Sequence, residues 1–200
     1  MTIAFCFDLD GTLTKTEILP CIASELGISQ EVATLTRVTM EGLITFEESL
    51  SLRVAILGRV PIERVHSIIA DIPMDEVLLR FIRSKPNQCF IVTGNLDIWT
   101  SRVVANMGCK GYFSKATLVE DQVRLETVLN KGDAINDLRA SGYTRIIAVG
   151  DGSNDVPMLR EADVAIAYGG THSPTASAIA AADYVIHDGD TLCSLLNTLS

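Results

Sequence analysis

The sequence places two carboxylates directly after its first apolar run. Residues 3–14 read IAFCFDLDGTLT, so Asp8 and Asp10 follow five apolar residues. In an extended segment residues i and i+2 point to the same side, and these two carboxylates therefore face the same space. Like charges so close raise one of the two pKa values unless a divalent cation or a shared proton neutralises them. The pair could hold a metal ion or move a proton.

A second acidic group follows a later apolar run. The stretch RIIAVGDGSND, residues 145–155, places Asp151 and Asp155 after an apolar run of the same kind. Four acids at one site in a chain with few charges need a hard cation, and Mg²⁺ prefers such oxygen ligands. A lone pair of aspartates is more often a turn or a helix cap, but the two motifs together favour a metal site.

Three further residues could bind an anion. Thr93 and Gly94 follow the apolar run CFIV, where a hydroxyl and exposed backbone N–H groups can hold a phosphate oxygen. Lys131 stands at the start of a predicted helix, where a cation opposes the helix dipole unless it meets an anion. Together with the acids, these residues indicate phosphoryl transfer, in which one aspartate attacks phosphorus and its neighbour moves the proton. Spacing alone does not say whether Asp8 or Asp10 is the nucleophile.

The stretch VGDGSND can also be compared with a glycine-rich dinucleotide-binding turn. Asp151 lies between its two glycines, where a pyrophosphate would have to approach the backbone closely. The third glycine of that turn is missing, and Asp155 adds further negative charge. We therefore favour the metal site, and a non-catalytic phosphate- or dinucleotide-binding module is the alternative from another functional class.

These residues need a scaffold that brings the ends of several strands together. Apolar runs typical of buried parallel strands recur along the chain, at residues 3–7, 88–94, 145–151, 162–168 and 182–187. Helical stretches over residues 96–108 and 131–142 lie between the later runs. Such alternation predicts an open, mostly parallel α/β sheet that binds ligands outside the carboxyl ends of its strands. Residues 116–127 break the alternation and predict a small hairpin.

The segment after the first strand has a helical period and no convincing strand. It predicts three or four helices, near residues 16–26, 29–41, 45–58 and 61–71. We expect residues 15–72 to form a helical insert between the first strand and the rest of the sheet, and residues 1–14 and 73–200 to form the α/β core.

The composition limits the classes of partner. The chain has 200 residues, of which 48% are hydrophobic and 20% charged, as in globular proteins. Its formal net charge of −9 argues against nucleic acids and anionic membranes, which require a basic face. The five cysteines are odd in number and form no CxxC pair, as expected of reduced thiols in the cytoplasm. No signal peptide or membrane span is evident, so we expect a cytoplasmic protein. A small anionic substrate is compatible with the negative charge if local cations or a metal bind it, and the phosphoryl-transfer motifs above predict a small phosphorylated metabolite.

In order and spacing, the motifs resemble those of the haloacid dehalogenase superfamily of phosphatases along essentially the whole chain. DLDGT at residues 8–12 is similar to the first motif of that superfamily and Thr93 to the second. Lys131 is similar to the third motif, and GDGSND at residues 150–155 to the fourth. Lys115 is a rival for the third motif, but it falls in the predicted hairpin rather than at a helix start.

The resemblance implies roles that the spacing leaves open. It implies a Rossmann-like core with Asp8 as the nucleophile and Asp10 as the general acid and base. It also implies Mg²⁺ held by the Asp8 carboxylate, the Asp10 backbone carbonyl and Asp151, with Asp155 in a supporting position.

The predicted cap is similar to that of the phosphoserine phosphatase family. The residues that carry this similarity are Glu17, Met40, Phe46 and Arg53. Glu17 can pair with the ammonium of phosphoserine, and Arg53 can bind its carboxylate through two hydrogen bonds. Met40 and Phe46 would exclude water from the pocket. Asn154, in the fourth motif, is a further candidate for contact with the substrate.

The sequence therefore predicts a Mg²⁺-dependent phosphomonoester hydrolase that forms an aspartyl-phosphate and acts on phosphoserine in serine biosynthesis. The alternative is a phosphatase or phosphotransferase of the same superfamily that acts on another small phosphorylated metabolite. Three residues depart from the phosphoserine phosphatase pattern. Gly11 and Thr93 each replace a serine, and Asn95 replaces a glycine.

Overall fold

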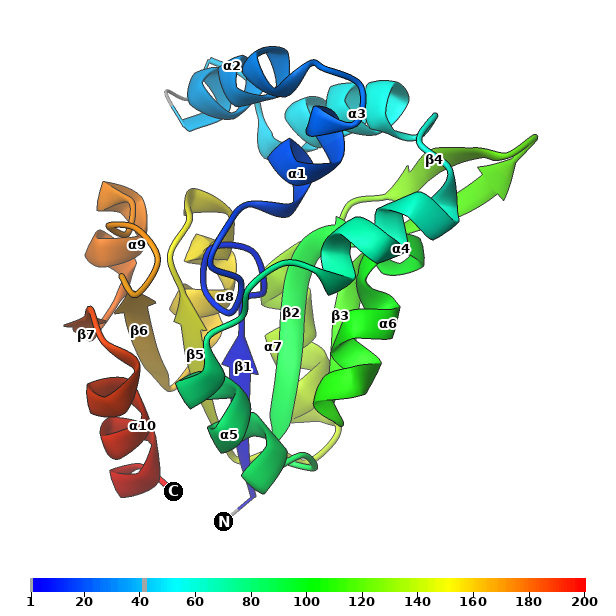
Figure 1. The fold of residues 1–200 in the computed structure, drawn as a ribbon. Coiled ribbons are helices and arrows are strands. Elements are labelled where there is room, and N and C mark those ends of the chain that lie inside the picture. Colours follow the sequence, from blue (N-terminus) through cyan, green and yellow to red (C-terminus); the bar gives the residue numbers. More distant parts are fainter. Residues whose placement is uncertain (1, 41–42) are drawn as a thin grey trace.

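A seven-stranded sheet forms the centre of the protein in the computed structural model (Figure 1). The model describes residues 2–40 and 43–200, and the side chain of Met40 lies outside the described part. The strands stand in the order β4-β3-β2-β1-β5-β6-β7. Their bounds are Ile3–Phe7 (β1), Cys89–Leu96 (β2), Lys110–Val119 (β3), Gln122–Thr127 (β4), Arg145–Gly150 (β5), Val164–Tyr168 (β6) and Tyr184–Ile186 (β7). Every neighbouring pair is parallel except β3 and β4.

Helices cover both faces of this sheet (Figure 1). Their bounds in the core are Glu76–Ser84 (α5), Asp97–Met107 (α6), Lys131–Ala140 (α7), Val156–Glu161 (α8), Ala176–Ala181 (α9) and Gly189–Thr198 (α10), with a 3₁₀ turn at Ser153–Asp155. Phe5 and Phe7 of β1 pack with α5, α6 and α10, while Ala4 and Cys6 pack with α7 and α8 on the opposite face. Because both faces of β1 are buried, its sequence is continuously apolar rather than alternating.

The predicted α/β sheet is confirmed, with two differences in its elements. The predicted hairpin at residues 116–127 is present as the antiparallel pair of β3 and β4, but its first strand is longer than predicted, because β3 begins at Lys110 and first pairs with β2. The inner part of β3 lacks a continuous apolar run, so periodicity did not reveal it. Helix α5 lies in a stretch without a predicted element. Its first turn is capped by Asp75, whose carboxylate accepts hydrogen bonds from the backbone N–H groups of Val77 and Leu78.

Four helices lie between β1 and α5, close to the predicted ranges. They are Ile18–Ser24 (α1), Ser29–Met40 (α2), Phe46–Leu57 (α3) and Ile62–Ala70 (α4). Helices α1–α3 lie beyond the carboxyl end of β1, and α4 runs back toward the core (Figure 1). The division into a core of residues 1–14 and 73–200 and a cap of residues 15–72 stays a prediction. Within the described residues, no helix has the length and apolar character needed to cross a bilayer.

The start and the end of α3 are both fixed by specific contacts. Thr45 and Glu48 form a capping box at its start, in which each side chain accepts a hydrogen bond from the other residue's backbone N–H. This places Phe46 at the first position of the helix. At the end of α3, the backbone N–H of Val123 in β4 donates to the carbonyl oxygen of Gly58 over 2.9 Å. A Cβ atom on Gly58 would lie 2.3 Å from the carbonyl oxygen of Val123, so the helix meets the hairpin backbone closely.

Gly58→Ala is expected to lower the free energy of unfolding by about 2–3 kcal/mol, because the added methyl group would overlap backbone atoms. The φ angle of Gly58 is −61°, which suits alanine, so the expected loss is steric. Urea unfolding measures it. Gly27→Ala is the matched control, since a Cβ atom there would meet nothing within 4 Å and only its φ of +68° is unfavourable, at a cost of about 1 kcal/mol. A smaller loss at Gly58 than at Gly27 would contradict the close contact.

Candidate active site

Three neighbouring strands bring together residues that are distant in the sequence. Asp8 and Asp151 directly follow β1 and β5, and Thr93 lies in the second half of β2. Since β1 pairs with both β2 and β5, these three side chains reach one edge of the sheet. All three residues are buried.

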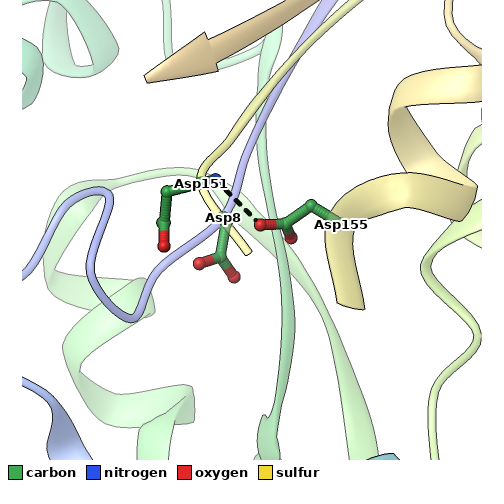
Figure 2. Close-up of side chains that lie close together, drawn as sticks. All are labelled: Asp8, Asp151 and Asp155. Carbon is green, nitrogen blue, oxygen red and sulfur yellow. Dashed lines mark hydrogen bonds between the residues drawn. The ribbon is translucent and has the colours of Figure 1, made fainter. Parts of the chain in front are cut away.

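A buried ionic cluster lies at this edge. The carboxylate oxygens of Asp8, Asp151 and Asp155 lie within 4.8 Å of one another, and Figure 2 shows the three side chains converging. Lys131 donates hydrogen bonds to Asp8 Oδ1 and, over 2.5 Å, to Asp155 Oδ1. Burial raises the pKa of Asp8 well above its usual range, and the negative charge of Asp155 adds to that effect. One ammonium group thus bonds to two of the three carboxyl groups, and the cluster holds more carboxyl groups than ammonium groups.

Asp155 holds the loop after β5 in place. Its Oδ1 atom accepts from Lys131, and its Oδ2 atom accepts from the backbone N–H groups of Asp151 and Gly152 over 2.9 and 2.8 Å. A Cβ atom on Gly150 would lie 2.5 Å from Asp155 Cγ, so only glycine allows this close approach. Because both of its oxygens are engaged, Asp155 is suited to support a metal-binding loop rather than to bind a metal directly.

Asp10 and Asp151 carry raised pKa values. Burial, followed by the charge of Glu17, raises the pKa of Asp10 to about 8, although the backbone N–H of Ile18 donates to its Oδ1 over 2.8 Å. Burial, followed by the charge of Asp155, raises the pKa of Asp151 to about 7. Thr12 opposes this second shift, because its hydroxyl donates to Asp151 Oδ1 over 2.5 Å. Both carboxyl groups therefore titrate near neutral pH in the metal-free protein.

A cavity of about 130 Å³ separates this edge of the sheet from helices α1–α3. Most of the site residues predicted from the sequence line it, namely Asp8, Asp10, Glu17, Phe46, Arg53, Thr93, Gly94, Asp151 and Asn154. Lys131 and Asp155 lie behind this wall and contact it through Asp8 and Asp151. Met40 ends α2, but its side chain lies outside the described residues. The rival Lys115 pairs with Asp97 on the surface, with Nζ 3.1 Å from Asp97 Oδ2.

The cavity is closed on one side by a contact between α3 and β2. A Cβ atom on Gly94 would lie 2.6 Å from Phe46 Cζ, so the ring packs on the bare backbone of β2. The pairing of β2 with β3 shifts between Thr93 and Leu96, which leaves Gly94 and Asn95 outside the regular ladder. The sequence Thr-Gly-Asn therefore makes both the backbone bulge and the space for the ring.

The charged groups of the cavity wall differ in burial. Arg53 is only 7% exposed, and its guanidinium donates to the carbonyl and hydroxyl oxygens of Ser49 over 3.2 and 2.8 Å. Burial lowers the pKa of Arg53, which nevertheless stays cationic at neutral pH. Glu17 immediately precedes α1 and is largely exposed to the cavity mouth.

The cavity wall also includes residues to which the sequence assigned no role, among them His172 and Asn95. His172 Nε2 lies 3.4 Å from Glu17 Oε1 and 3.3 Å from Asp151 Oδ2. Its loop follows β6, so the strand-end rule that selected the other residues also covers it. The side-chain amide of Asn95 donates to Asp10 Oδ2 over 3.3 Å. Asn95 was identified in the sequence as a departure from the family pattern, but no role was predicted for it.

Comparisons with known proteins identify a family and relatives that share this fold. A family model described as haloacid dehalogenase-like hydrolase matches residues 4–163. The chain is 31% identical to a phosphoserine phosphatase of Methanocaldococcus jannaschii, over 81% of this chain and 83% of the relative. It is 30% identical to a phosphoserine phosphatase of Archaeoglobus fulgidus, over 81% of this chain and 51% of that longer relative.

Two solved structures cover nearly the whole chain. A substrate-bound phosphoserine phosphatase complex has a TM-score of 0.82 at 27% identity and covers 99% of this chain and 98% of its own. A phospho-aspartyl intermediate analogue of phosphoserine phosphatase has a TM-score of 0.81 at 28% identity, with 98% of both chains covered.

The stability of the metal-free protein is expected to fall as the pH rises from about 5 to about 8.5, because the native state binds more protons than the unfolded state there. The pKa values of Asp10 and Asp151 in the folded protein are raised to about 8 and about 7. Their contribution to the free energy of unfolding is therefore complete below their pKa values in the unfolded chain. It is lost as the pH rises through their pKa values in the folded protein. The Glu17 carboxylate raises the pKa of His172 to about 9, so the contribution of His172 to stability also falls as the pH rises. Urea unfolding in a chelator across this pH range measures the slope. Asp151→Asn should make the decrease of stability with pH less steep. Stability that rises with pH over this range would contradict the raised pKa values of these groups.

Proposed function

This chain belongs to the haloacid dehalogenase-like hydrolase family, and from that premise we propose that it hydrolyses phosphoserine through a phosphorylated Asp8. It is a phosphoserine phosphatase-like phosphomonoester hydrolase. One observation carries the proposal. The cavity above Asp8 presents an acidic group, Glu17, and a basic group, Arg53, from the helices that face it. A phosphate ester that also carries an ammonium and a carboxylate matches this arrangement.

We propose Mg²⁺ as the metal of this site. The donors are hard oxygens, and the excess of carboxylates over ammonium groups in the buried cluster fits a divalent cation. The Asp8 and Asp151 carboxylates and the Asp10 backbone carbonyl would hold it, while Asp155 holds the loop. When bound, the ion would supply positive charge and Lewis acidity to the phosphoryl oxygens.

The first half of the reaction forms a bond between Asp8 and phosphorus. An Asp8 carboxylate oxygen attacks phosphorus while the bond between phosphorus and the serine oxygen breaks. Lys131, already bonded to Asp8, offers positive charge next to the transferring group. Thr93 and Gly94 offer a hydroxyl and a backbone N–H group at the same strand end for the phosphoryl oxygens.

Asp10 moves the proton in both halves of the reaction. Burial raises the pKa of Asp10 to about 8 in the metal-free protein, so this carboxyl group is suited to carry the proton that goes to the departing serine oxygen. The resulting carboxylate then takes a proton from water, whose oxygen attacks phosphorus and breaks its bond to Asp8. Hydrogen bonds from the Ile18 backbone and the Asn95 side chain hold the Asp10 carboxyl group for this task.

The ends of the substrate are bound by the cap side of the cavity. Glu17 would pair with the ammonium and Arg53 with the carboxylate of phosphoserine. The Phe46 ring, which packs on Gly94, would keep water from the phosphoryl group. Asn154 lines the same cavity and remains a proposed contact, as does Met40 on the sequence pattern alone.

The release of serine would place the protein in serine biosynthesis, and we propose a cytoplasmic location. All five cysteines are free thiols, which suits a reducing compartment. The alternative is hydrolysis or transfer of the phosphoryl group of another small metabolite. The departures at Gly11, Thr93 and Asn95 favour it, because all three lie at or beside the cavity.

The purified protein with Mg²⁺ is expected to hydrolyse phosphoserine with a higher kcat/KM than an aryl phosphate such as p-nitrophenyl phosphate. Asp8→Asn should lower kcat for both esters by roughly 10⁴-fold or more, since the loss of a nucleophile costs up to ~10⁶. Phosphate release measures both. Asp121→Asn, an exposed position in the β3–β4 turn, is the matched control and should retain full activity. Full activity in Asp8→Asn would exclude the aspartyl-phosphate route, and no preference for phosphoserine would exclude it as the substrate.

Arg53→Ala is expected to raise KM for phosphoserine about 10- to 100-fold, the effect of losing a hydrogen-bonded charge pair. A small ester with no charged group besides the phosphate, such as methyl phosphate, should be affected little, because it lacks the carboxylate. Steady-state kinetics on both esters measure the difference. Arg53→Lys keeps the charge without the planar fork and should lie between the wild type and Arg53→Ala. Equal losses on both esters would mean that Arg53, which bonds to Ser49, is only structural.

A further inference from the structure

The loop that joins β6 to α9 reaches into the cavity and is tied to the catalytic edge on both sides of His172. The hydroxyl of Thr171 donates to the carbonyl oxygen of Thr14 over 3.1 Å. The backbone N–H of Thr175 donates to the carbonyl oxygen of Asp151 over 2.8 Å. These bonds fix the loop against the chain that leaves β1 and against the loop after β5, so the position of His172 is defined by its neighbours.

The imidazole of His172 lies over Gly11. A Cβ atom on Gly11 would lie 2.7 Å from His172 Nε2, well inside van der Waals contact. The φ angle of Gly11 is +84°, which further disfavours any other residue. The glycine that departs from the phosphoserine phosphatase pattern is therefore the residue that leaves room for this imidazole.

His172 is also the neighbour of the substrate-facing acid. Its Nε2 atom lies 3.4 Å from Glu17 Oε1 and 3.3 Å from Asp151 Oδ2, so the imidazole lies between these two carboxylates. Among the described residues no other ion pair to the Glu17 carboxylate is found. The Glu17 side chain is 46% exposed. An exposed glutamate without a fixed partner loses rotamer entropy when it binds a ligand, and a partner already in place reduces that cost.

We propose that His172 is a positioning residue, which holds the Glu17 carboxylate toward the ammonium of the substrate from the space above Gly11. The proposal rests on the proposed function, since it assigns Glu17 to the substrate ammonium. One carboxylate oxygen is held by the Nε2–H group of the imidazole, and the other is left to accept from the ammonium. Gly11 and His172 then form a pair in which the missing side chain of one makes room for the other.

His172→Ala is expected to raise KM for phosphoserine about tenfold, as for the loss of a hydrogen bond to a charged group. Any change that comes from the contact of His172 with Asp151 should be the same for esters with and without an ammonium. The matched probe is the phosphate ester of 3-hydroxypropionate, which has the same carboxylate but no ammonium. Its KM should not change, because Glu17 has no partner on it. Ser173→Ala, at an exposed position of the same loop, is the control and should leave KM unchanged for both esters.

Two further variants separate positioning from a general structural effect. His172→Gln keeps an N–H donor of similar reach and should restore most of the affinity for phosphoserine. In the Glu17→Gln background, His172→Ala should add little to the rise in KM, because residues that act through one another are not additive. Thermal unfolding of each variant shows that the fold is retained.

The outcomes distinguish this proposal from the proposed function. If the wild type shows the same KM for both esters, phosphoserine recognition through Glu17 is wrong, and the role of His172 falls with it. If the wild type prefers phosphoserine and His172→Ala keeps that preference, the role of His172 alone is overturned. An equal rise in KM for both esters, or additivity with Glu17→Gln, also overturns it.

Discussion

The site depends on one buried ammonium. Lys131, 2% exposed, bonds to both Asp8 and Asp155, and without it these two buried carboxylates would have no ion-pair partner among the described side chains. Isolated buried charges are costly, whereas a buried charge with partners is tolerated. Because Asp155 also binds the backbone of Asp151 and Gly152, this ammonium indirectly sets the shape of the loop after β5. The same Lys131 ammonium therefore both neutralises the buried carboxylates and helps to fix the loop after β5.

The sheet order makes this arrangement possible. With β1 between β2 and β5, the strand ends bring Asp8, Thr93 and Asp151 to one place, where we propose a nucleophile, a phosphate-binding hydroxyl and a metal-binding carboxylate. The chain then leaves β1 to form α1–α4, which return above the same edge and supply Glu17, Phe46 and Arg53. In the proposed function, the residues at the strand ends carry out the chemistry and those of the helical segment recognise the substrate, with Asp10 and Glu17 between the two.

Much of this site could be predicted because its residues follow simple rules. Asp8 and Asp151 end apolar runs, and Lys131 is a cation at a helix start, which indicated a buried anion that the structure supplies as Asp8 and Asp155. His172 and Asn95 could not be assigned, since their roles come from contacts across the fold rather than from spacing. The inner part of β3 was missed because it lacks a continuous apolar run. The position of these residues and of this strand segment is determined by tertiary packing rather than by a local sequence pattern.

The central claim is that Asp8 becomes phosphorylated, and chemical trapping tests it most directly. The enzyme with Mg²⁺ is mixed with phosphoserine, quenched in acid within milliseconds, and treated with borohydride, which reduces an acyl phosphate to an alcohol. Proteolysis and mass spectrometry then locate the reduced residue. The account predicts homoserine at position 8 and unmodified aspartate at Asp10, Asp151 and Asp155. Reduction at another aspartate, or none in a sample that turns over phosphoserine, would contradict it.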